Sequence, residues 1–362
     1  MSATADRGII FRSRLPPLFL IVARYYPARR ARENMLLLNQ SLIERLGTMR
    51  ECIEVIDVTM REVARKLFDQ PPRQVLSPAA GTIFGIMPGA CAAYGIFGAK
   101  LIAVSQHPSD LSLASHQGAV VLFDRASGAL SAILDAGSIT ALRTAAASAV
   151  ATRCLARPDS RVLALIGSGH QAHKHLEAMR LVRPIERVVI WSRTAAHAQR
   201  FAQHHRTDGL PVTVARTARE AVEEADVICT LTSSADPVLR GEWLTPGQHI
   251  NAVGSGVAGH RELDEEAVRR SKFFADCSDF VRDQGGEYIA ALRAARVTRD
   301  HLLGDIGAVL DGQIAGRTSP RDITVYKSLG LIAQDIACSR HLVLKALEIG
   351  GCPDVPFASY AH

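Results

Sequence analysis

The stretch Arg161-Val-Leu-Ala-Leu-Ile-Gly167-Ser-Gly169-His-Gln-Ala172 decides the fold, because an apolar run leads directly into a glycine turn. The run predicts a buried strand, and G-x-G-x-x-A is typical of the turn that joins a strand to a helix in dinucleotide sites. Gly167 permits the tight turn, Gly169 lets the backbone approach a pyrophosphate, and the small Ala172 allows close helix–strand packing. We therefore expect a dinucleotide cofactor, and a purely structural glycine turn is the alternative.

Strands and helices alternate after this turn. The expected elements are a helix from the turn to about Leu181, a strand at Arg187–Trp191, a helix at Ala195–His204, and short strands at Val212–Ala215, Asp226–Thr232 and His249–Val253. Such alternation predicts a doubly wound parallel sheet of the Rossmann type, built through right-handed crossovers. An Ala-rich helix, Thr140–Ala156, is expected just before it.

The chain before the Ala-rich helix has a different pattern. Met35 to about Pro72 is helical in periodicity, and Ser41 with Glu44 fits a capping box. Four apolar runs bounded by turn residues then predict a small mixed sheet: Gly81–Met87, Tyr94–Ser105, Ala119–Asp124 and Ala129–Leu134. Near the other end, Ile323–Ile349 indicates one long helix that returns to this first domain. The predicted fold class is therefore α/β, with a mixed α+β part beside the parallel sheet.

Composition excludes several classes of function. The chain has 362 residues and a net charge of +6, but residues 1–34 hold seven arginines against two acidic residues, so the remainder is nearly neutral. With only 5% aromatic residues as well, nucleic-acid binding is not expected. The seven cysteines are dispersed and form no C-x-x-C pair, which favours a reducing cytoplasm. No apolar run reaches the ~18 residues that span a bilayer, so no membrane segment is expected.

The end of the second predicted strand indicates which dinucleotide binds. It reads Trp191-Ser192-Arg193-Thr194 and lacks the acidic residue that usually bonds the ribose 2′-hydroxyl of NAD. A guanidinium and two hydroxyls suit a 2′-phosphate. We therefore expect NADPH as the cofactor and NADH as the second choice; the alternative is that Arg193 only faces solvent.

Three histidines on the helix after the glycine turn raise the question of a metal. His170, His173 and His175 share no single helical face, and no carboxylate accompanies them at ligand spacing. We therefore predict no metal site.

Three cations lie among apolar segments: Arg73, Lys100 and Arg143. An isolated cation that faces a core is costly, so each must reach water or meet an anion. A substrate carboxylate is the functional interpretation, and exposure on the surface is the other.

Six ordered motifs make the chain similar to a known family. They are Ser115-His-Gln-Gly-Ala-Val-Val-Leu-Phe, Thr140-Ala-Leu-Arg-Thr-Ala-Ala, Ile166-Gly-Ser-Gly-His-Gln-Ala, Ile190-Trp-Ser-Arg-Thr, Gly241-Glu-Trp-Leu-Thr-Pro-Gly-Gln-His-Ile-Asn-Ala-Val-Gly and Val325-Tyr-Lys-Ser-Leu-Gly. Together they resemble the ornithine cyclodeaminase/mu-crystallin family from Met35 to about Ile349. The resemblance implies a Rossmann domain inserted in a substrate and dimerisation domain made from both chain ends, and a homodimer. The implied divisions are an extension at 1–34, the substrate domain at 35–143 plus 322–350, the NADP domain at 144–321, and a tail at 351–362.

The resemblance also assigns individual residues. The family's carboxylate-binding cations match Arg73, Lys100 and Arg143. Ser115 and Gly256 fall on the substrate side. The nucleotide contacts match Gly169, His170, Gln171, Ser192, Arg193, Thr194, Thr230, Val253 and Leu329.

Two departures from the cyclodeaminase pattern point to the reaction. Gly85 stands where cyclodeaminases carry a general-base Glu, and Gly254-Ser-Gly256 stands where they carry an Asp. Ketimine reductases of the mu-crystallin type share both departures and read N-R-T where this chain has Ser192-Arg-Thr. We therefore expect an oxidoreductase that reduces a carboxylate-bearing C=N bond with NADPH, for example in pyrroline-2-carboxylate or piperideine-2-carboxylate.

Lys100 is the expected proton-handling residue in this reaction, and His116 is a second candidate. The alternatives, in order, are an amino-acid or opine-type dehydrogenase, an ornithine cyclodeaminase, and a non-catalytic small-molecule binding protein.

Overall fold

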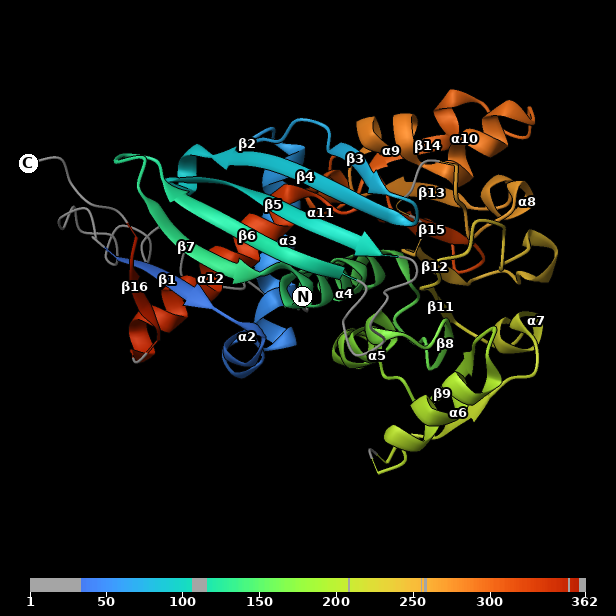
Figure 1. The fold of residues 1–362 in the computed structure, drawn as a ribbon. Coiled ribbons are helices and arrows are strands. Elements are labelled where there is room, and N and C mark those ends of the chain that lie inside the picture. The colour runs from blue at the N-terminus through green and yellow to red at the C-terminus, as the bar shows by residue number, and fades with distance from the viewer. Residues whose placement is uncertain are drawn as a thin grey trace, which may run out of the picture.

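The computed structural model describes residues 34–105, 116–207, 209–254, 256, 259–350 and 352–357. It contains two eight-stranded sheets, each with its own helices, and they lie next to each other in the molecule (Figure 1). The predicted α/β fold class with a Rossmann-type parallel sheet is confirmed.

The first sheet is mostly antiparallel and follows the order β16-β1-β7-β6-β5-β4-β2, with β3 paired to β4. Its strands are β1 Asn34–Leu38, β2 Phe68–Asp69, β3 Gln74–Ala79, β4 Thr82–Cys91, β5 Ile96–Ser105, β6 His116–Asp124, β7 Leu130–Asp135 and β16 Asp354–Pro356. The four runs predicted as strands are present as β4, β5, β6 and β7. They form an antiparallel meander, in which each strand pairs with the next one along the chain.

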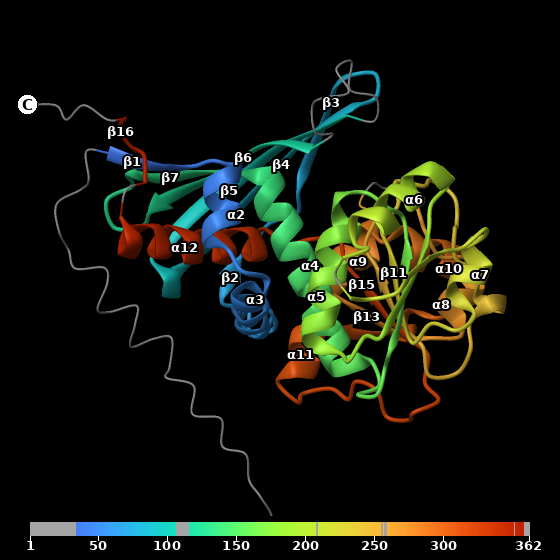
Figure 2. The ribbon, with the colours of Figure 1, turned by 90° about the horizontal axis from the view of Figure 1, so that it is seen from below.

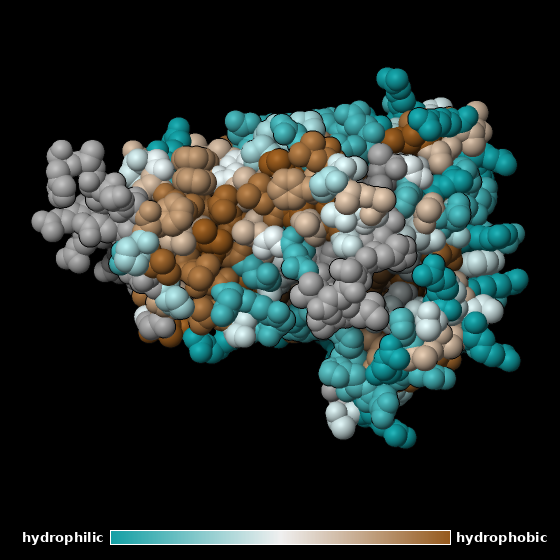
Figure 3. Space-filling model, viewed as in Figure 1, coloured by the Kyte–Doolittle hydropathy of each residue, from teal (hydrophilic) through white to brown (hydrophobic). Residues whose placement is uncertain are grey.

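In the part of the chain that the structure describes, helices cover one face of this sheet and not the other (Figure 2). They are α2 Gln40–Leu46, α3 Met49–Ala64, α4 Ala136–Leu155 and α12 Ile332–Ile349. Helix α12 crosses β4, β5 and β6, and α4 packs against β6 before it continues to the second sheet. On the opposite face, β4 to β7 present an apolar surface (Figure 3). The first sheet therefore has one face packed against helices and one apolar face that no described helix covers.

The second sheet is entirely parallel, in the order β10-β9-β8-β11-β12-β15-β13-β14. Its strands are β8 Val162–Ile166, β9 Arg187–Trp191, β10 Val212–Val214, β11 Val227–Thr230, β12 His249–Ala252, β13 Lys272–Ala275, β14 Leu302–Asp305 and β15 Thr324–Lys327. Its helices are α5 His170–Val182, α6 Ala195–His204, α7 Ala218–Val222, α8 Glu265–Arg269, α9 Ser278–Gln284, α10 Gly286–Arg293 and α11 Ile306–Leu310. The strand order reverses at β8, where α/β folds bind ligands at the carboxyl ends of the strands.

Phe68–Asp69, inside the stretch predicted as helical, is the strand β2, and two longer segments predicted as helix are also strands. Met35–Leu38 lies in β1, which pairs with β7 and β16, and Asn39 rather than Ser41 caps the following helix. The beginning of the predicted closing helix is β15, and α12 begins only at Ile332. Both strands are short apolar runs, for which periodicity cannot separate strand from helix.

The predicted domain boundaries do not coincide with the ends of elements. The boundary after Arg143 falls inside α4, and β15 belongs to the second sheet although it follows residue 321. The division into domains at these boundaries therefore stays a prediction. Within the described residues, none of the helices is both long and apolar enough to cross a bilayer.

Candidate active site

The glycine turn that begins the second sheet has the geometry that its sequence requires. Gly167 follows β8 with φ +114°, and a Cβ there would lie 2.7 Å from the carbonyl oxygen of Leu231. A side chain is therefore excluded both by the backbone conformation and by the neighbouring strand end. The chain turns sharply at this point and enters α5.

The N-terminus of α5 is open to an anion. Gly169 is its N-cap and no side chain caps the helix, so its first N–H groups have no side-chain partner there. A Cβ on Gly169 would meet nothing within 4 Å, whereas Ala172 is fully buried against the core. Open space in front of uncapped N–H groups, at the positive end of the helix dipole, fits a pyrophosphate.

A cavity of about 990 Å³ extends from this turn toward the first sheet. The second-sheet residues that line it include Gly167, Ser168, Gly169, His170, Gln171, Ser192, Arg193 and Thr194, and the residues from the first sheet and α4 include Gln117, Gly118, Asp135, Ser138, Thr140 and Ala141. The Oε1 atom of Gln171 is buried without a hydrogen-bond partner in the described part of the chain. An unpaired buried acceptor beside the cavity suits a ligand that donates hydrogen bonds. The residues present therefore fit a dinucleotide.

Arg193 lies at the rim of this cavity. It follows β9, its side chain is exposed, and it forms no ion pair with any of the residues that the structure describes. Ser192 and Thr194 on either side also line the cavity. This edge of the site is polar and cationic.

Three further residues were expected to contact the nucleotide: Thr230, Val253 and Leu329. They lie at or just after the carboxyl ends of β11, β12 and β15, but they do not line the cavity. The hydroxyl of Thr230 is buried and donates to Glu262 at 2.8 Å. Their contact with a cofactor stays a prediction.

The second part of the site is a buried group of charges. Lys100 on β5 is 2% exposed, and its Nζ donates to the hydroxyl of Thr140 at 2.6 Å and to Asp335 at 3.1 Å. Arg143 on α4 donates from Nε to the same Asp335 oxygen at 3.1 Å and from Nη1 to Gln334 at 3.0 Å. One carboxylate therefore serves two cations, and Thr140 joins this group to the cavity.

Arg73 completes the group from the other side. Its Nη2 donates to the carbonyl oxygens of Leu329 and Gly330 at 2.6 and 3.0 Å. Asp276 accepts hydrogen bonds from the backbone N–H groups of the same two residues, at 2.7 and 2.6 Å. Burial raises the pKa of its carboxyl group. The turn at Leu329 and Gly330 is therefore held by a guanidinium at its carbonyls and by a carboxylate at its amides.

The charges in this group do not balance. Arg73, Lys100 and Arg143 face two carboxylates among the described residues, Asp335 and Asp276, which leaves one positive charge in excess when all are ionised. Burial lowers the pKa of Lys100 to about 8; Asp335 opposes this shift, and Arg143 and Arg73 add to it. Lys100 and Arg143 are buried and Arg73 is half-buried, so this excess of positive charge is costly in the absence of an anion. The geometry therefore suits an anionic ligand.

The remaining predicted residues are placed as follows. An ideal Cβ on Gly256 would lie 4.0 Å from Nη1 of Arg73, so Gly256 borders the cation group. Gly85 lies in β4, opposite Ile102 of β5. Ser115 lies outside the described residues, and His116 is the first residue of β6.

The three histidines that the sequence places after the glycine turn, His170, His173 and His175, lie in three different surroundings. His170 lines the cavity, and His173 contacts the end of α6. His175 is fully buried between the carbonyl of Gln171 and the hydroxyl of Ser148, where burial lowers its pKa to about 4. It is a core histidine.

Sequence reasoning missed both carboxylates of the cation group. Asp335 lies in the apolar run that begins α12, and Asp276 directly follows the apolar strand β13. An acidic residue inside an apolar run is itself a signal, because a buried charge needs a partner. That signal indicates burial but not which cation is the partner.

Comparison with known proteins identifies the chain's relatives. The model of the ornithine cyclodeaminase/mu-crystallin family matches residues 32–348. The chain is 36% identical to the ketimine reductase mu-crystallin of Mus musculus over 272 residues, which cover 75% of this chain and 83% of that protein. It is 32% identical to a Δ1-pyrroline-2-carboxylate reductase of Bacillus cereus over 320 residues, which cover 87% and 98% of the two chains.

A solved structure shows the same fold. The Δ1-pyrroline-2-carboxylate reductase of Thermococcus litoralis, in complex with NADH and L-proline, superimposes with a TM-score of 0.86 at 32% identity, covering 89% of this chain and all of that one. The family match extends over most of the chain, as the six sequence motifs predicted. The chain belongs to the ornithine cyclodeaminase/mu-crystallin family.

Proposed function

We propose that the protein reduces the C=N bond of a carboxylate-bearing imine, with NADPH as the hydride donor. The observation that carries this proposal is the excess positive charge of Arg73, Lys100 and Arg143 beside a cavity that fits a dinucleotide. A substrate carboxylate would balance that charge. The relatives from Bacillus cereus and Mus musculus, named as reductases of pyrroline-2-carboxylate and of ketimines, support the same class of substrate.

The chemistry needs little from the protein beyond binding and orientation. The cofactor, when bound, supplies a hydride, and Arg73, Lys100 and Arg143 would hold the substrate carboxylate so that the imine carbon faces it. As the new C–H bond forms, the electron pair of the C=N double bond moves to nitrogen. If that nitrogen is already protonated, the product is an amine and no strong base is required. Glycine at positions 85 and 256 is consistent with this route.

We propose that Lys100 takes part in the transfer of the proton of the imine nitrogen. Its pKa of about 8 lets Nζ either hold or release a proton near neutral pH. Its hydrogen bond to Thr140, which lines the cavity, supports this role.

The preference for NADPH rests on Arg193. Its exposed guanidinium at the cavity rim has no ion-pair partner among the described residues, and no acidic residue occupies positions 192–194. A 2′-phosphate would supply that partner. Because the Thermococcus litoralis reductase holds NADH, the two cofactors must be compared directly. Arg193→Ala should raise the KM for NADPH and leave the KM for NADH unchanged; an equal change for both would contradict this role.

We also propose that two copies of the chain pair through the uncovered face of the first sheet. Phe97, Ala99 and Leu101 alternate outward along β5, and the ring of Phe97 stacks on Phe123 with centroids 5.1 Å apart. Figure 3 shows the resulting apolar surface. Exposed apolar surfaces of this kind mark interfaces. Sedimentation equilibrium should give twice the chain mass of 39.1 kDa, and Phe97→Glu should reduce it to one chain.

The proposed activity is tested by following NADPH oxidation with three groups of substrates. The cyclic ketimines pyrroline-2-carboxylate and piperideine-2-carboxylate should be reduced. Mixtures of a 2-oxo acid and an amine test for an amino-acid or opine-type dehydrogenase. Formation of proline from L-ornithine with NAD would contradict the proposal and favour a cyclodeaminase. Turnover of none of these, with the dinucleotide still bound, would favour a binding protein. The cytoplasmic location stays a prediction from the dispersed cysteines.

A further inference from the structure

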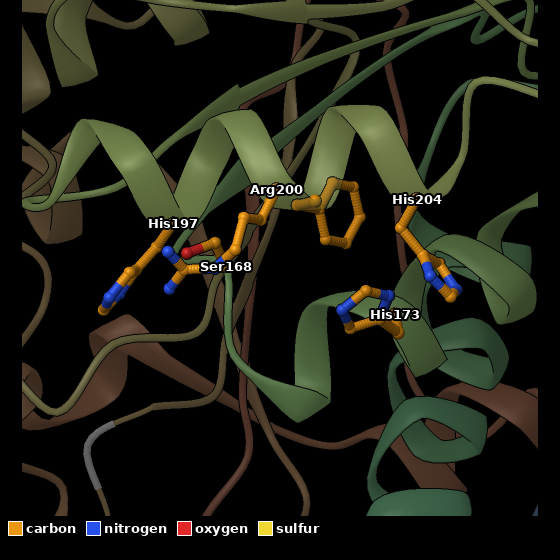
Figure 4. Close-up of a pocket in the computed structure, with 6 residues that line it drawn as sticks. Ser168, His173, His197, Arg200 and His204 are labelled. Carbon is orange, nitrogen blue, oxygen red and sulfur yellow. The ribbon is translucent and has the colours of Figure 1, made fainter.

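Three histidines meet where α5 lies against the end of α6. His173 comes from the first turn of α5, and His204 and His205 end α6; Figure 4 shows His173 and His204 next to each other. Their ring centroids lie 5.2 Å apart for His173 and His204, 5.0 Å for His173 and His205, and 4.9 Å for His204 and His205. One nitrogen from each ring lies within 4.8 Å of the other two.

The nitrogens are arranged nearly as ligands of one ion. Nδ1 of His173 and Nε2 of His205 are hydrogen-bonded at 2.9 Å, and an ion bound to both nitrogens would replace the proton between them. Imidazole nitrogens that bind one tetrahedral zinc at about 2.0–2.1 Å lie about 3.3 Å from each other. The observed separations, from 2.9 Å to at most 4.8 Å, bracket this value, so small side-chain rotations would bring all three nitrogens to one ion. Neutral imidazoles suit Zn²⁺ and similar transition metals.

The surroundings leave room for an ion to enter. A cavity of about 500 Å³ opens at the cluster and is also lined by Lys174 and Glu177. Two cations of α5, Lys174 and Arg180, also line this cavity, and Lys174 is paired with Glu177 at 3.2 Å. His204 is exposed, which gives an ion access from solvent. Water, or Glu177 after its release from Lys174, would complete the coordination.

We propose that His173, His204 and His205 form a zinc-binding site that joins α5 to α6. Both helices begin at cofactor loops: α5 at the glycine turn and α6 directly after Ser192, Arg193 and Thr194. A zinc ion there stabilises the relative position of the two loops without touching the reacting atoms. The spacing of histidines in α5 did not reveal the site, because two of its ligands come from another helix.

The test uses the full-length chain without a histidine tag, treated with a chelator and then titrated with ZnCl₂ by calorimetry. The wild-type protein should bind one zinc per chain, and zinc should raise its Tm. His204→Ala removes an exposed side chain and should fold; it should bind zinc at least tenfold more weakly and lose the rise in Tm, as should His173→Ala. Cobalt(II) should give the visible absorption of a four-coordinate site with three nitrogen ligands in the wild type, and neither His204→Ala nor His173→Ala should show it.

His197→Ala is the matched control, because His197 is an exposed histidine of the same helix and lies away from His173 and His204 (Figure 4). Its zinc affinity should equal that of the wild type. All variants keep the seven cysteines, so zinc bound by thiols remains in each of them. Absence of stoichiometric zinc in the wild type, or the same zinc affinity in His204→Ala, would overturn the site and leave a packed cluster of aromatic rings around Phe201.

Discussion

Two buried lysines of this molecule differ in how their charge is balanced. Nζ of Lys327, at the end of β15, lies 2.9 and 3.0 Å from the two carboxylate oxygens of Glu287, and both side chains are fully buried. Lys100 instead shares one carboxylate, Asp335, with Arg143. Lys327 also opposes the rise in pKa that burial causes in the neighbouring Glu262, so this lysine lies among carboxylates. The group around Lys100 has one positive charge in excess instead, and for that reason we propose it, rather than the Lys327 pair, as a binding site.

The largest expected effect is on the stability contributed by the Lys327–Glu287 pair. Lys327→Met leaves Glu287 buried without a cation, which should reduce the free energy of unfolding by about 3–5 kcal/mol. Urea denaturation of both proteins measures the loss. Adding Glu287→Leu should recover part of it, because the carboxylate that lost its cation is then removed, although Glu262 stays buried nearby. A loss below about 1 kcal/mol would show that Lys327 does not stabilise Glu287 in this way.

Arg143→Ala should affect binding more than folding. The substrate carboxylate loses a charge-assisted hydrogen bond worth about 1.5–3 kcal/mol, so the KM should rise about tenfold to 150-fold. Steady-state kinetics with a cyclic ketimine measures this. Arg153→Ala is the control, since Arg153 is on the same helix, half-exposed, and paired with Glu54. An unchanged KM in Arg143→Ala would remove Arg143 from the site.

The pH dependence of binding should report on Lys100. With a pKa of about 8, Lys100 is charged below pH 8 and loses its charge as the pH rises through that value. The inhibition constant of pyrrole-2-carboxylate, whose nitrogen is not basic, should therefore rise above pH 8, by at most tenfold per unit. Lys100→Arg should remove this rise, because arginine stays charged. The same rise in the variant would assign it to another group.

The smallest effect is expected from a substitution of Asp335, the carboxylate that Lys100 and Arg143 share, and it concerns the pH profile of inhibition. Asp335 raises the pKa of Lys100 against the effect of burial, so Asp335→Asn should move the inflection in the same inhibition profile below pH 8. Weaker inhibition throughout, with the inflection unmoved, would mean that Asp335 only positions the two cations.

Elements that depend on local pattern could be predicted from the sequence. The strand Arg187–Trp191 and the helix Ala195–His204 have the predicted bounds, because their apolar periodicity and flanking turns lie within the segments themselves. Strands β1 and β15 could not be predicted, since their partners lie elsewhere in the chain and pairing with them overrides the local pattern.

The candidate site divides in the same way. The glycine turn and Arg193 follow from a motif within one βαβ unit, so they could be placed in advance. The sharing of Asp335 by Lys100 and Arg143 could not, because it requires α12 to cross β5 beside α4. Sequence spacing carries no information on such a crossing.

The turn at Leu329 and Gly330 has a mechanical consequence. It lies on the segment that connects β15 of the second sheet to α12 of the first, and Arg73 holds its carbonyls while Asp276 holds its amides. Gly330 has φ +81°, and a Cβ there would lie 2.7 Å from Nη1 of Arg143. Any rotation of one sheet against the other would therefore pull on the guanidinium groups of Arg73 and Arg143, which we propose to bind the substrate carboxylate. We therefore expect substrate affinity and the angle between the two sheets to be linked through this turn, so that a ligand which fixes the one also fixes the other.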